Sequence, residues 1–193
     1  MIRMATKADI PAILDIYGPY VLNTTYTFEY TVPTVAEFTA RFEAITRQFP
    51  WLVWEEAGQV LGYAYGSAPF ERAAYGWCGE ISVYLAPEAH RRGIGTKLCL
   101  AVEEILWQQG YQVIFSLITS ENTPSLLFHR RLGYQDSFVC PRCGWKFGRW
   151  LDVHWLEKRR PVDSPPGNAP LPWHFIVEND RKLQDILANL SLS

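Results

Sequence analysis

The residues best placed to do chemistry lie between Glu80 and Thr96, in the segment EISVYLAPEAHRRGIGT. Glu80 is a carboxylate on an apolar, β-branched segment, where loss of water raises the pKa of a carboxyl group toward the range of a general base. A basic turn containing Gly93 and Gly95 follows and precedes an amphipathic segment. We therefore expect a general base one strand-length away from an anion-binding turn.

The turn itself has the composition of a pyrophosphate-binding loop. Glycines let the backbone approach a ligand closely, and the free N–H groups and dipole at a helix start favour an anion. Arginines suit phosphate oxygens. The spacing is neither that of a Walker loop nor that of a Rossmann fingerprint, and a tight turn with solvated arginines would explain the same residues. The expected binding residues are Arg91, Arg92, Gly93, Ile94, Gly95 and Thr96.

Hydrophobic periodicity and turn residues indicate the elements that position these groups. Apolar segments predict strands over Ile2–Ala5, Trp51–Ala57, Val60–Ser67, Trp77–Leu85, Gln112–Ile118, Tyr134–Val139 and Lys146–Leu156. Helical spacing and capping residues predict helices that follow Thr6, Thr34, Gly95 and Asn122, and a last one over Glu178–Leu190. Trp77–Leu85 is nearly all apolar, so we expect it to be central and covered on both faces. The order of elements predicts an α/β protein with helices on both faces of one sheet.

The length of 193 residues allows one compact domain. We divide the chain into a domain of residues 1–158, a proline- and glycine-rich linker of residues 159–172, and a helical extension of residues 173–193. The extension is expected to dock on the domain or on a partner subunit.

Composition narrows the class of protein. The hydrophobic share is 48% and mean hydropathy is −0.09, as in a globular protein. Net charge is −2 and the pI is about 6.1, so no general basic field is present to recruit nucleic acid. No apolar run approaches the ~20 residues of a membrane span, and the N-terminus lacks the apolar core of a signal peptide. These features predict a cytoplasmic protein without a membrane or nucleic-acid partner.

The cysteines offer a weaker signal. Cys140 and Cys143 have the spacing of a metal knuckle or redox pair, but no second such pair exists. His154 or His174 would have to complete a metal site, so we expect no metal and place this segment in the connection between the last two strands. Cys78 and Cys99, on apolar segments, are expected to be buried thiols.

Several motifs together resemble the GNAT superfamily of acetyl-CoA-dependent N-acetyltransferases, and within it the phosphinothricin acetyltransferase family. The turn HRRGIG matches the family's pyrophosphate motif, except that His90 stands where Gln or Arg is usual. Asn122, His129 and the sequence Leu132-Gly133-Tyr134 match its helix motif. The segments TTYTFEY, ERAAYGWCGEISVY and GWKFGRWLDV are similar to the subfamily. The resemblance covers about Ile2 to Lys158 and implies the GNAT fold, with a twisted, mostly antiparallel mixed sheet between helices.

The resemblance also implies roles for individual residues. Glu80 becomes the base that deprotonates the acceptor amine, and His129 occupies the place of a proton donor to the CoA sulfur, for which titration near neutral pH suits imidazole. Backbone groups of Val83, Tyr84 and Leu85 are expected to pair with the pantetheine arm of acetyl-CoA. Asn122 caps its helix and, with Ser125, is expected to contact that arm; capping alone would also explain Asn122.

For the acceptor, the resemblance implies two loops at the substrate mouth, carrying Phe28, Glu29, Arg72 and Tyr75. An arginine there can bind an amino-acid carboxylate, although the aromatic residues could equally be core. Phe147 replaces a histidine common in the family. The expected substrates are small amino-acid-like amines of the phosphinothricin, methionine sulfone or methionine sulfoximine type, and the expected assembly is a homodimer.

Direct transfer of the acetyl group is expected, because the sequence places no cysteine or serine beside a base as a nucleophile. Two alternatives stay open. One is acetylation of a protein or peptide amine, which would need an open groove beside the thioester. The other is a regulatory domain that binds acyl-CoA without catalysis.

Overall fold

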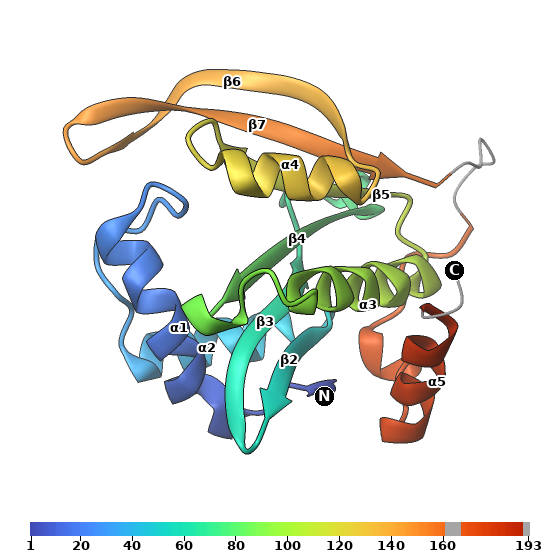
Figure 1. The fold of residues 1–193 in the computed structure, drawn as a ribbon. Helices are drawn as coiled ribbons and strands as arrows, with labels where there is room; N and C mark the ends of the chain where they lie inside the picture. Colours follow the sequence, from blue (N-terminus) through green and yellow to red (C-terminus); the bar gives the residue numbers. More distant parts are fainter. Residues whose placement is uncertain (161–166, 191–193) are drawn as a thin grey trace.

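The computed structural model describes residues 1–160 and 167–190. In this part of the chain, seven strands form one sheet in the order β1-β2-β3-β4-β5-β7-β6 (Figure 1). Neighbouring strands are antiparallel except β4 and β5, which are parallel. The strands are β1 (Ile2–Met4), β2 (Trp51–Glu56), β3 (Gln59–Ser67), β4 (Cys78–Leu85), β5 (Val113–Thr119), β6 (Gln135–Lys146) and β7 (Arg149–Arg159). The helices are α1 (Ile10–Asn23), α2 (Val35–Ile45), α3 (Ile94–Gln109), α4 (Thr123–Arg131) and α5 (Asp180–Leu190).

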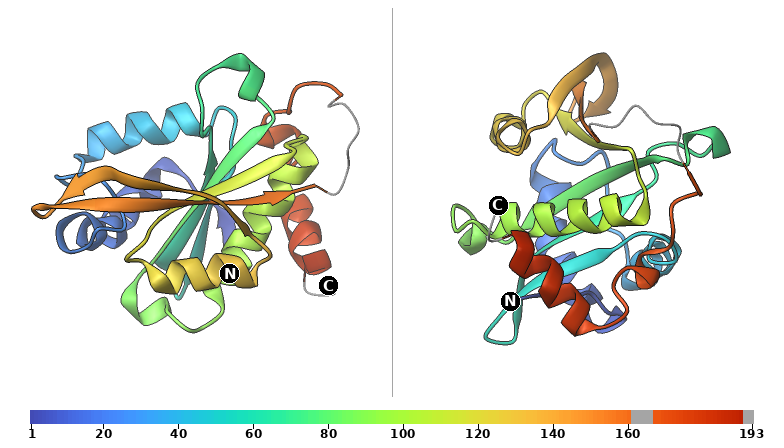
Figure 2. Two further views of the ribbon diagram at one scale, coloured as in Figure 1. Left: turned by 90° about the horizontal axis from the view of Figure 1, so that it is seen from above. Right: turned by 90° about the vertical axis from the view of Figure 1, so that its right-hand side faces the viewer.

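Helices cover both faces of this sheet, as predicted (Figure 2). The apolar stripe of α1 packs with α2 over one face, around the fully buried Trp51 and Tyr63. α3 packs on the other face, and α4 and α5 join the same apolar cluster. The two predicted capping boxes are present, at Thr6 and at Thr34. The mixed α/β architecture expected from the sequence is therefore confirmed.

β4 occupies the middle of the sheet, but it is paired with β5 along only part of its length. The register joins Cys78 to Val113 and Glu80 to Phe115, and no pairing with β5 follows beyond that point. The two strands then separate, so β4 from Ser82 to its end is only partly buried. The prediction of a central strand is confirmed, whereas full coverage of both faces is wrong because the sheet opens here.

β6 and β7 form a long hairpin that reaches over the side of the molecule where α1 lies (Figures 1 and 2). Its tight turn is Phe147 and Gly148, both at positive φ. Cys140 and Cys143 lie inside β6, at an irregularity opposite β7, and not in the connection as predicted. The sequence CPRC misled the assignment because the strand continues through a bulge that absorbs the extra residues.

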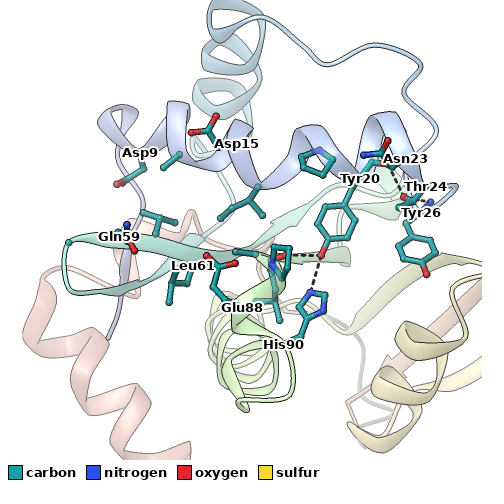
Figure 3. Close-up of a pocket in the computed structure, with 18 of the residues that line it drawn as sticks. Asp9, Asp15, Tyr20, Asn23, Thr24, Tyr26, Gln59, Leu61, Glu88 and His90 are labelled. Carbon is teal, nitrogen blue, oxygen red and sulfur yellow. Dashed lines mark hydrogen bonds between the residues drawn. The ribbon is translucent and has the colours of Figure 1, made fainter.

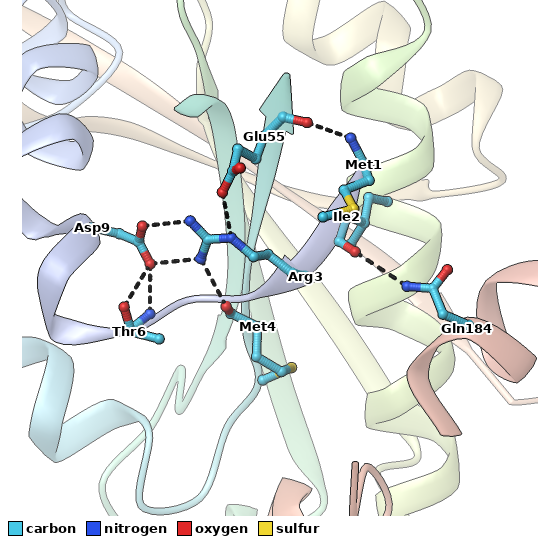
Figure 4. A network of polar contacts seen from close by, with 8 residues as sticks. All are labelled: Met1, Ile2, Arg3, Met4, Thr6, Asp9, Glu55 and Gln184. Atoms are coloured by element: carbon cyan, nitrogen blue, oxygen red, sulfur yellow. Dashed lines mark hydrogen bonds and ion pairs between the residues drawn. The ribbon is translucent and has the colours of Figure 1, made fainter. Parts of the chain in front are cut away.

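A polar cluster ties the N-terminal strand to the rest of the domain (Figure 4). The Arg3 guanidinium donates to both carboxylate oxygens of Asp9 at 2.7 and 2.8 Å, and to Glu55 at 2.6 Å. This pairing lowers the pKa of Asp9. The amide of Gln184 on α5 donates to the backbone oxygen of Ile2 at 3.5 Å. The edge strand β1 is thereby fixed between α1 and the C-terminal helix.

The C-terminal extension docks on α3 of its own chain (Figure 1). Trp173 donates its indole N–H to Thr46 O at 2.7 Å, and the Gln109 amide donates to Leu171 O at 2.6 Å. Leu183 and Ile186 of α5 are buried in the main apolar cluster. Of the expected linker, residues 161–166 lie outside the described residues. Within residues 167–172, the backbone oxygens of Pro170 and Leu171 accept hydrogen bonds from side chains of the domain.

Candidate active site

The separation of β4 from β5 creates a narrow slot of about 60 Å³ in the middle of the sheet. In an antiparallel pair alternate residues turn their N–H and C=O groups toward one neighbour. Between Ile81 and Leu85, the groups that do not face β3 are therefore directed toward the open side. The slot is lined by Tyr20, Tyr26, Ile81, Ser82, Val83, Tyr84, Ser116, Leu117, Ile118, Asn122, Ser125 and His129. Of the three residues expected to pair with an extended thioester arm, Val83 and Tyr84 line this slot, whereas Leu85 is not among its lining residues.

Glu80 stands at the point where the two strands part. Its side chain shares a face of β4 with Ser82 and Tyr84, because side chains alternate along a strand. Burial raises the pKa of Glu80 to about 7, which confirms the predicted direction. Among the described residues its carboxylate has no ion-pair partner, so it is not a structural carboxylate paired with an arginine. A carboxyl group with this pKa is poised to exchange a proton near neutrality.

The Tyr65 hydroxyl lies close to this carboxylate on the neighbouring strand β3. It hydrogen-bonds to Ser82, and burial raises the pKa of Tyr65 to about 12, with a smaller contribution from the charge of Glu80. Tyr65 therefore stays protonated and supplies a fixed polar neighbour to the base.

The basic turn precedes α3, but the helix begins at Ile94, so Gly95 and Thr96 lie in its first turn and the prediction of a helix that follows Gly95 is wrong by two residues. Gly93 is the N-cap at φ 77°, a left-handed conformation that glycine adopts without strain. A side chain added at Gly93 would meet nothing within 4 Å, so the space in front of this backbone is open. The first N–H groups of α3, at Ile94, Gly95 and Thr96, have no acceptor within the helix. This helix start can therefore hold an anion.

The two arginines of the turn differ. Arg91 is exposed, with φ 59°, whereas Arg92 donates to both oxygens of Glu56 at 2.7 and 3.0 Å. An exposed ion pair of this kind contributes only about 0–1 kcal/mol. A phosphate can therefore compete with Glu56 for the Arg92 guanidinium.

His90 does not point toward the turn. The Tyr20 hydroxyl donates to Leu85 O at 2.7 Å, and the His90 Nε2 lies 3.3 Å from the same hydroxyl (Figure 3). His90 therefore faces α1, and the departure from the family motif removes a side chain from the phosphate side.

Figure 3 shows a second, larger hollow, of about 840 Å³. It lies between α1, the β2–β3 turn and the segment from Leu85 to His90. Tyr20 and Tyr26 line both this hollow and the slot. Neither Glu80 nor His129 lines it, whereas His129 lines the slot and Glu80 directly precedes its lining residue Ile81, so we place the chemistry at the slot.

Asn122 caps α4, as predicted: its side-chain oxygen accepts from Ser125 N at 3.2 Å, and Pro124 is in the first turn. One turn further along the helix, His129 is 2% exposed, and burial lowers its pKa to about 4. The expectation that His129 titrates near neutral pH is wrong, because the sequence could not show that this ring turns inward.

Ser116 on β5 was not singled out from the sequence, yet its Oγ lies 3.1 Å from His129 Nε2. The premise that no serine lies beside a base is therefore wrong. An imidazole with a pKa of about 4 is nevertheless a weak base for activating a hydroxyl. The sequence signal was a lone serine in the apolar strand VIFSLIT, which only the partner helix makes meaningful.

The expected acceptor residues fall in two separate places. Phe28 and Glu29 lie in the loop between α1 and α2, where Glu29 pairs with Arg41. Arg72 precedes the short helical turn Ala73–Tyr75 between β3 and β4, Tyr75 ends it, and both side chains are exposed. Phe28 and Tyr75 are 40% and 47% exposed, so neither is a core residue.

The hairpin β6–β7 fixes the first of these loops. Lys146, 1% exposed, donates from Nζ to Thr27 O at 2.7 Å, and Tyr30 donates to Trp145 O at 2.6 Å. A side chain at Gly144 would come within 2.3 Å of the Phe28 ring, so only glycine allows this contact. The sequence could not reveal these contacts, because each joins segments more than a hundred residues apart.

No group of three or more metal-ligating side chains occurs in residues 1–160 and 167–190. His154 pairs instead with Asp136.

The two thiols expected to be buried differ. Cys99 is fully buried, which raises its pKa, whereas Cys78 is only half-buried. Within residues 1–160 and 167–190, no helix is long and apolar enough to span a membrane.

Comparison with known proteins agrees with this geometry. Residues 2–155 match the family model of the acetyltransferase (GNAT) domain. An L-methionine sulfoximine/L-methionine sulfone acetyltransferase of Pseudomonas paraeruginosa is 42% identical over 162 residues, which cover 81% of this chain and 92% of the relative.

Two solved structures are similar over most of their length. One is a GNAT superfamily phosphinothricin acetyltransferase of Sinorhizobium meliloti in complex with AcCoA, with 35% identity, a TM-score of 0.84, and coverage of 89% of this chain and 95% of that one. The other is a ribosomal-protein-alanine N-acetyltransferase of Brucella melitensis, with 34% identity, a TM-score of 0.80, and coverage of 83% and 99%.

The chain belongs to the GNAT acetyltransferase family. It is an N-acetyltransferase that uses acetyl-CoA, and within the family it is similar to the phosphinothricin and methionine sulfoximine acetyltransferases. The alternative of a binding domain without catalysis is therefore set aside.

Proposed function

We propose that this enzyme acetylates the free amine of a small amino-acid-like compound, of the phosphinothricin, methionine sulfone or methionine sulfoximine type. The observation that carries the proposal is Glu80, an ion-pair-free carboxylate with a pKa of about 7 at the point where β4 and β5 separate. The names of similar enzymes support the substrate class.

In this proposal the slot, the basic turn and Glu80 each have one task. Acetyl-CoA supplies an activated acetyl thioester. The turn from Arg91 to Thr96 holds its diphosphate, and backbone groups between Val83 and Leu85 align the arm and polarise the carbonyl. Glu80 removes the proton that an amino-acid ammonium carries near pH 7, and direct transfer follows without an acyl-enzyme.

For the acceptor we propose that Arg72 binds the carboxylate, with Tyr75, Phe28 and Glu29 shaping the mouth. Arg72 has no ion-pair partner among the described residues, so its guanidinium is free for a ligand. Glu29, by contrast, is committed to Arg41 and shapes the loop through that pair.

The test is CoA release measured over a panel of amino acids, amino-acid analogues, polyamines and peptides. Phosphinothricin or the methionine derivatives should be preferred. Arg72→Ala should raise KM for amino acids by ~10-fold or more, the scale of a lost charged hydrogen bond. Arg47→Ala, an exposed arginine at the end of α2, is the matched control. Equal effects of Arg72→Ala on acceptors with and without a carboxylate would remove Arg72 from the site.

A second candidate is acetylation of a peptide N-terminus. The similarity to a ribosomal-protein-alanine N-acetyltransferase favours it. A peptide that begins with alanine belongs in the same panel, and preferred turnover of that peptide would replace the small-molecule assignment.

We also propose a cytoplasmic homodimer. The β6–β7 hairpin exposes a set of large apolar side chains, Phe138, Val139, Trp145, Phe147 and Trp150, which are 43–58% exposed. Large exposed apolar patches mark association surfaces. Light scattering after size exclusion should give twice the chain mass of 22.2 kDa, and Trp150→Glu should shift it toward the monomer.

A further inference from the structure

We propose that Ser125 is the catalytic hydroxyl that donates a hydrogen bond to the thioester sulfur as it leaves, with His129 and Ser116 as positioning residues behind it. This rests on the proposed function, because it concerns the same slot. The contacts among Ser116, His129 and Ser125 fix which atom donates each hydrogen bond.

The state of the His129 ring follows from its contacts. Its Nδ1 lies 2.9 Å from the backbone oxygen of Ser125, and a carbonyl oxygen only accepts, so Nδ1 carries a hydrogen. The ring is buried among Ser116, Ser125, Phe128 and Tyr134, with no carboxylate in contact among the described residues. A buried imidazole without a carboxylate stays neutral, so Nε2 carries no hydrogen.

The two serine hydroxyls are then oriented. Ser116 Oγ, 3.1 Å from the bare Nε2, must donate to it. Ser125 Oγ, 3.3 Å from Nδ1, can only accept from it, because Nδ1–H is a donor. The hydrogens therefore point in one direction, from Ser116 through His129 to Ser125.

The hydrogen of the Ser125 hydroxyl is left without an acceptor in residues 1–160 and 167–190, and Ser125 lines the slot. A donor fixed in this way needs no reorganisation when negative charge develops on sulfur. His129 cannot be this donor in the same state, since its single ring hydrogen is shared between the two oxygens of Ser125. The slot therefore offers sulfur a serine hydroxyl, and the imidazole holds it in place.

CoA itself is the probe for the test. A hydroxyl that donates to sulfur stabilises the thiolate, so it lowers the thiol pKa of CoA bound to the enzyme without acceptor. Ultraviolet absorbance of the thiolate, followed against pH, measures that pKa. In Ser125→Ala it should rise by about one unit, the equivalent of a tenfold change. Turnover should fall ~10- to 100-fold while CoA affinity stays within about threefold.

Two further variants separate a donor from a packing residue. Ser125→Thr keeps the hydroxyl and should restore both the thiol pKa and turnover. Ser116→Ala leaves Ser125 in place and should shift the thiol pKa by less than Ser125→Ala. Thr119→Val is the matched control on β5, because it removes a buried hydroxyl that has no hydrogen-bond partner among the described residues. It should change neither quantity.

The outcomes distinguish donation by the Ser125 hydroxyl from donation by the His129 imidazole. An unchanged thiol pKa in Ser125→Ala overturns the role of this hydroxyl, and a larger rise in His129→Asn would assign the donation to the imidazole. Failure of the wild-type enzyme to bind CoA would overturn the proposed function itself, because the thiol titration needs no acceptor.

Discussion

Two regions of the domain, the open middle of the sheet and the attachment of the C-terminal extension, treat polar groups in opposite ways. At the slot, β4 and β5 separate, so the backbone groups between Ile81 and Leu85 that face away from β3 have no strand beside them. The second region is where the C-terminal extension attaches to the domain, which we call the C-terminal clasp. Here loop backbone oxygens accept short hydrogen bonds: the Gln109 amide donates to Gln48 O at 2.7 Å and to Leu171 O at 2.6 Å.

The difference shows where this fold holds function and where it holds stability. A ligand can bind only where hydrogen-bonding capacity is left open, and an open sheet lowers local stability. At the clasp, hydrogen-bonding groups of the domain are paired with residues of the C-terminal extension, which lies beyond the matched family segment that ends at residue 155. Changes at the slot should therefore affect activity, and changes at the clasp should affect unfolding.

Glu80→Gln tests the open region most strongly. It should lower turnover by ~10² to 10⁴, because it keeps the shape and removes the base. In the wild type, kcat/KM should rise with pH and level off above about 7, where the carboxylate is ionised. Glu88→Gln is the control, because Glu88 is an exposed carboxylate in the connection between β4 and α3. A loss of tenfold or less would make Glu80 structural.

The same variant should stabilise the fold at high pH. The folded-state pKa of about 7 lies above the ordinary value of 4.5, so the native state binds the proton more tightly than the unfolded chain. That advantage is complete below pH 4.5 and disappears as pH rises through 7. At pH 8, Glu80→Gln should therefore raise the free energy of unfolding by about 1–3 kcal/mol. Denaturant unfolding of the wild type and of Glu80→Gln at pH 5 and pH 8 measures this difference. If the gap in unfolding free energy between the two proteins is the same at both pH values, the prediction is contradicted.

Gly93→Trp tests the basic turn before α3. A side chain here occupies the space in front of the turn, so acetyl-CoA affinity should fall by ~100-fold or more, measured by calorimetry. Gly58→Trp is a closely matched control: Gly58 has φ 79° and equally open surroundings, but it lies in the β2–β3 turn. Both variants carry the same backbone strain, of about 1–2 kcal/mol. Equal affinities would move the cofactor away from this turn.

Trp173→Ala tests the clasp and should have the smallest effect on function. It removes the bond to Thr46 O and part of the apolar cluster, so unfolding free energy should fall by about 2–4 kcal/mol. Acetyl-CoA affinity of the folded fraction should not change. Phe175→Ala, at a side chain 60% exposed, should leave stability within about 0.5 kcal/mol. A loss of affinity in Trp173→Ala would show that the two regions are coupled.

Local sequence predicted most elements well, because the signals for them are short-range. The stripe of α1, the capping box at Thr34, the β2–β3 hairpin and the turn before α3 all depend on neighbours within a few residues. The prediction was wrong for CPRC, where a cysteine spacing suggested a connection and the strand continued through a bulge.

The candidate site divides in the same way. The sequence by itself determined which groups are available: a carboxylate on β4, a glycine-rich basic turn and a capping asparagine on α4. Only the tertiary structure decided their states. Burial raised the pKa of Glu80 to about 7 and lowered that of His129 to about 4, and the pairing of Ser116 with His129 joined a strand to a helix. The reason is physical: desolvation and hydrogen-bond direction depend on neighbours in space, which a linear sequence does not state.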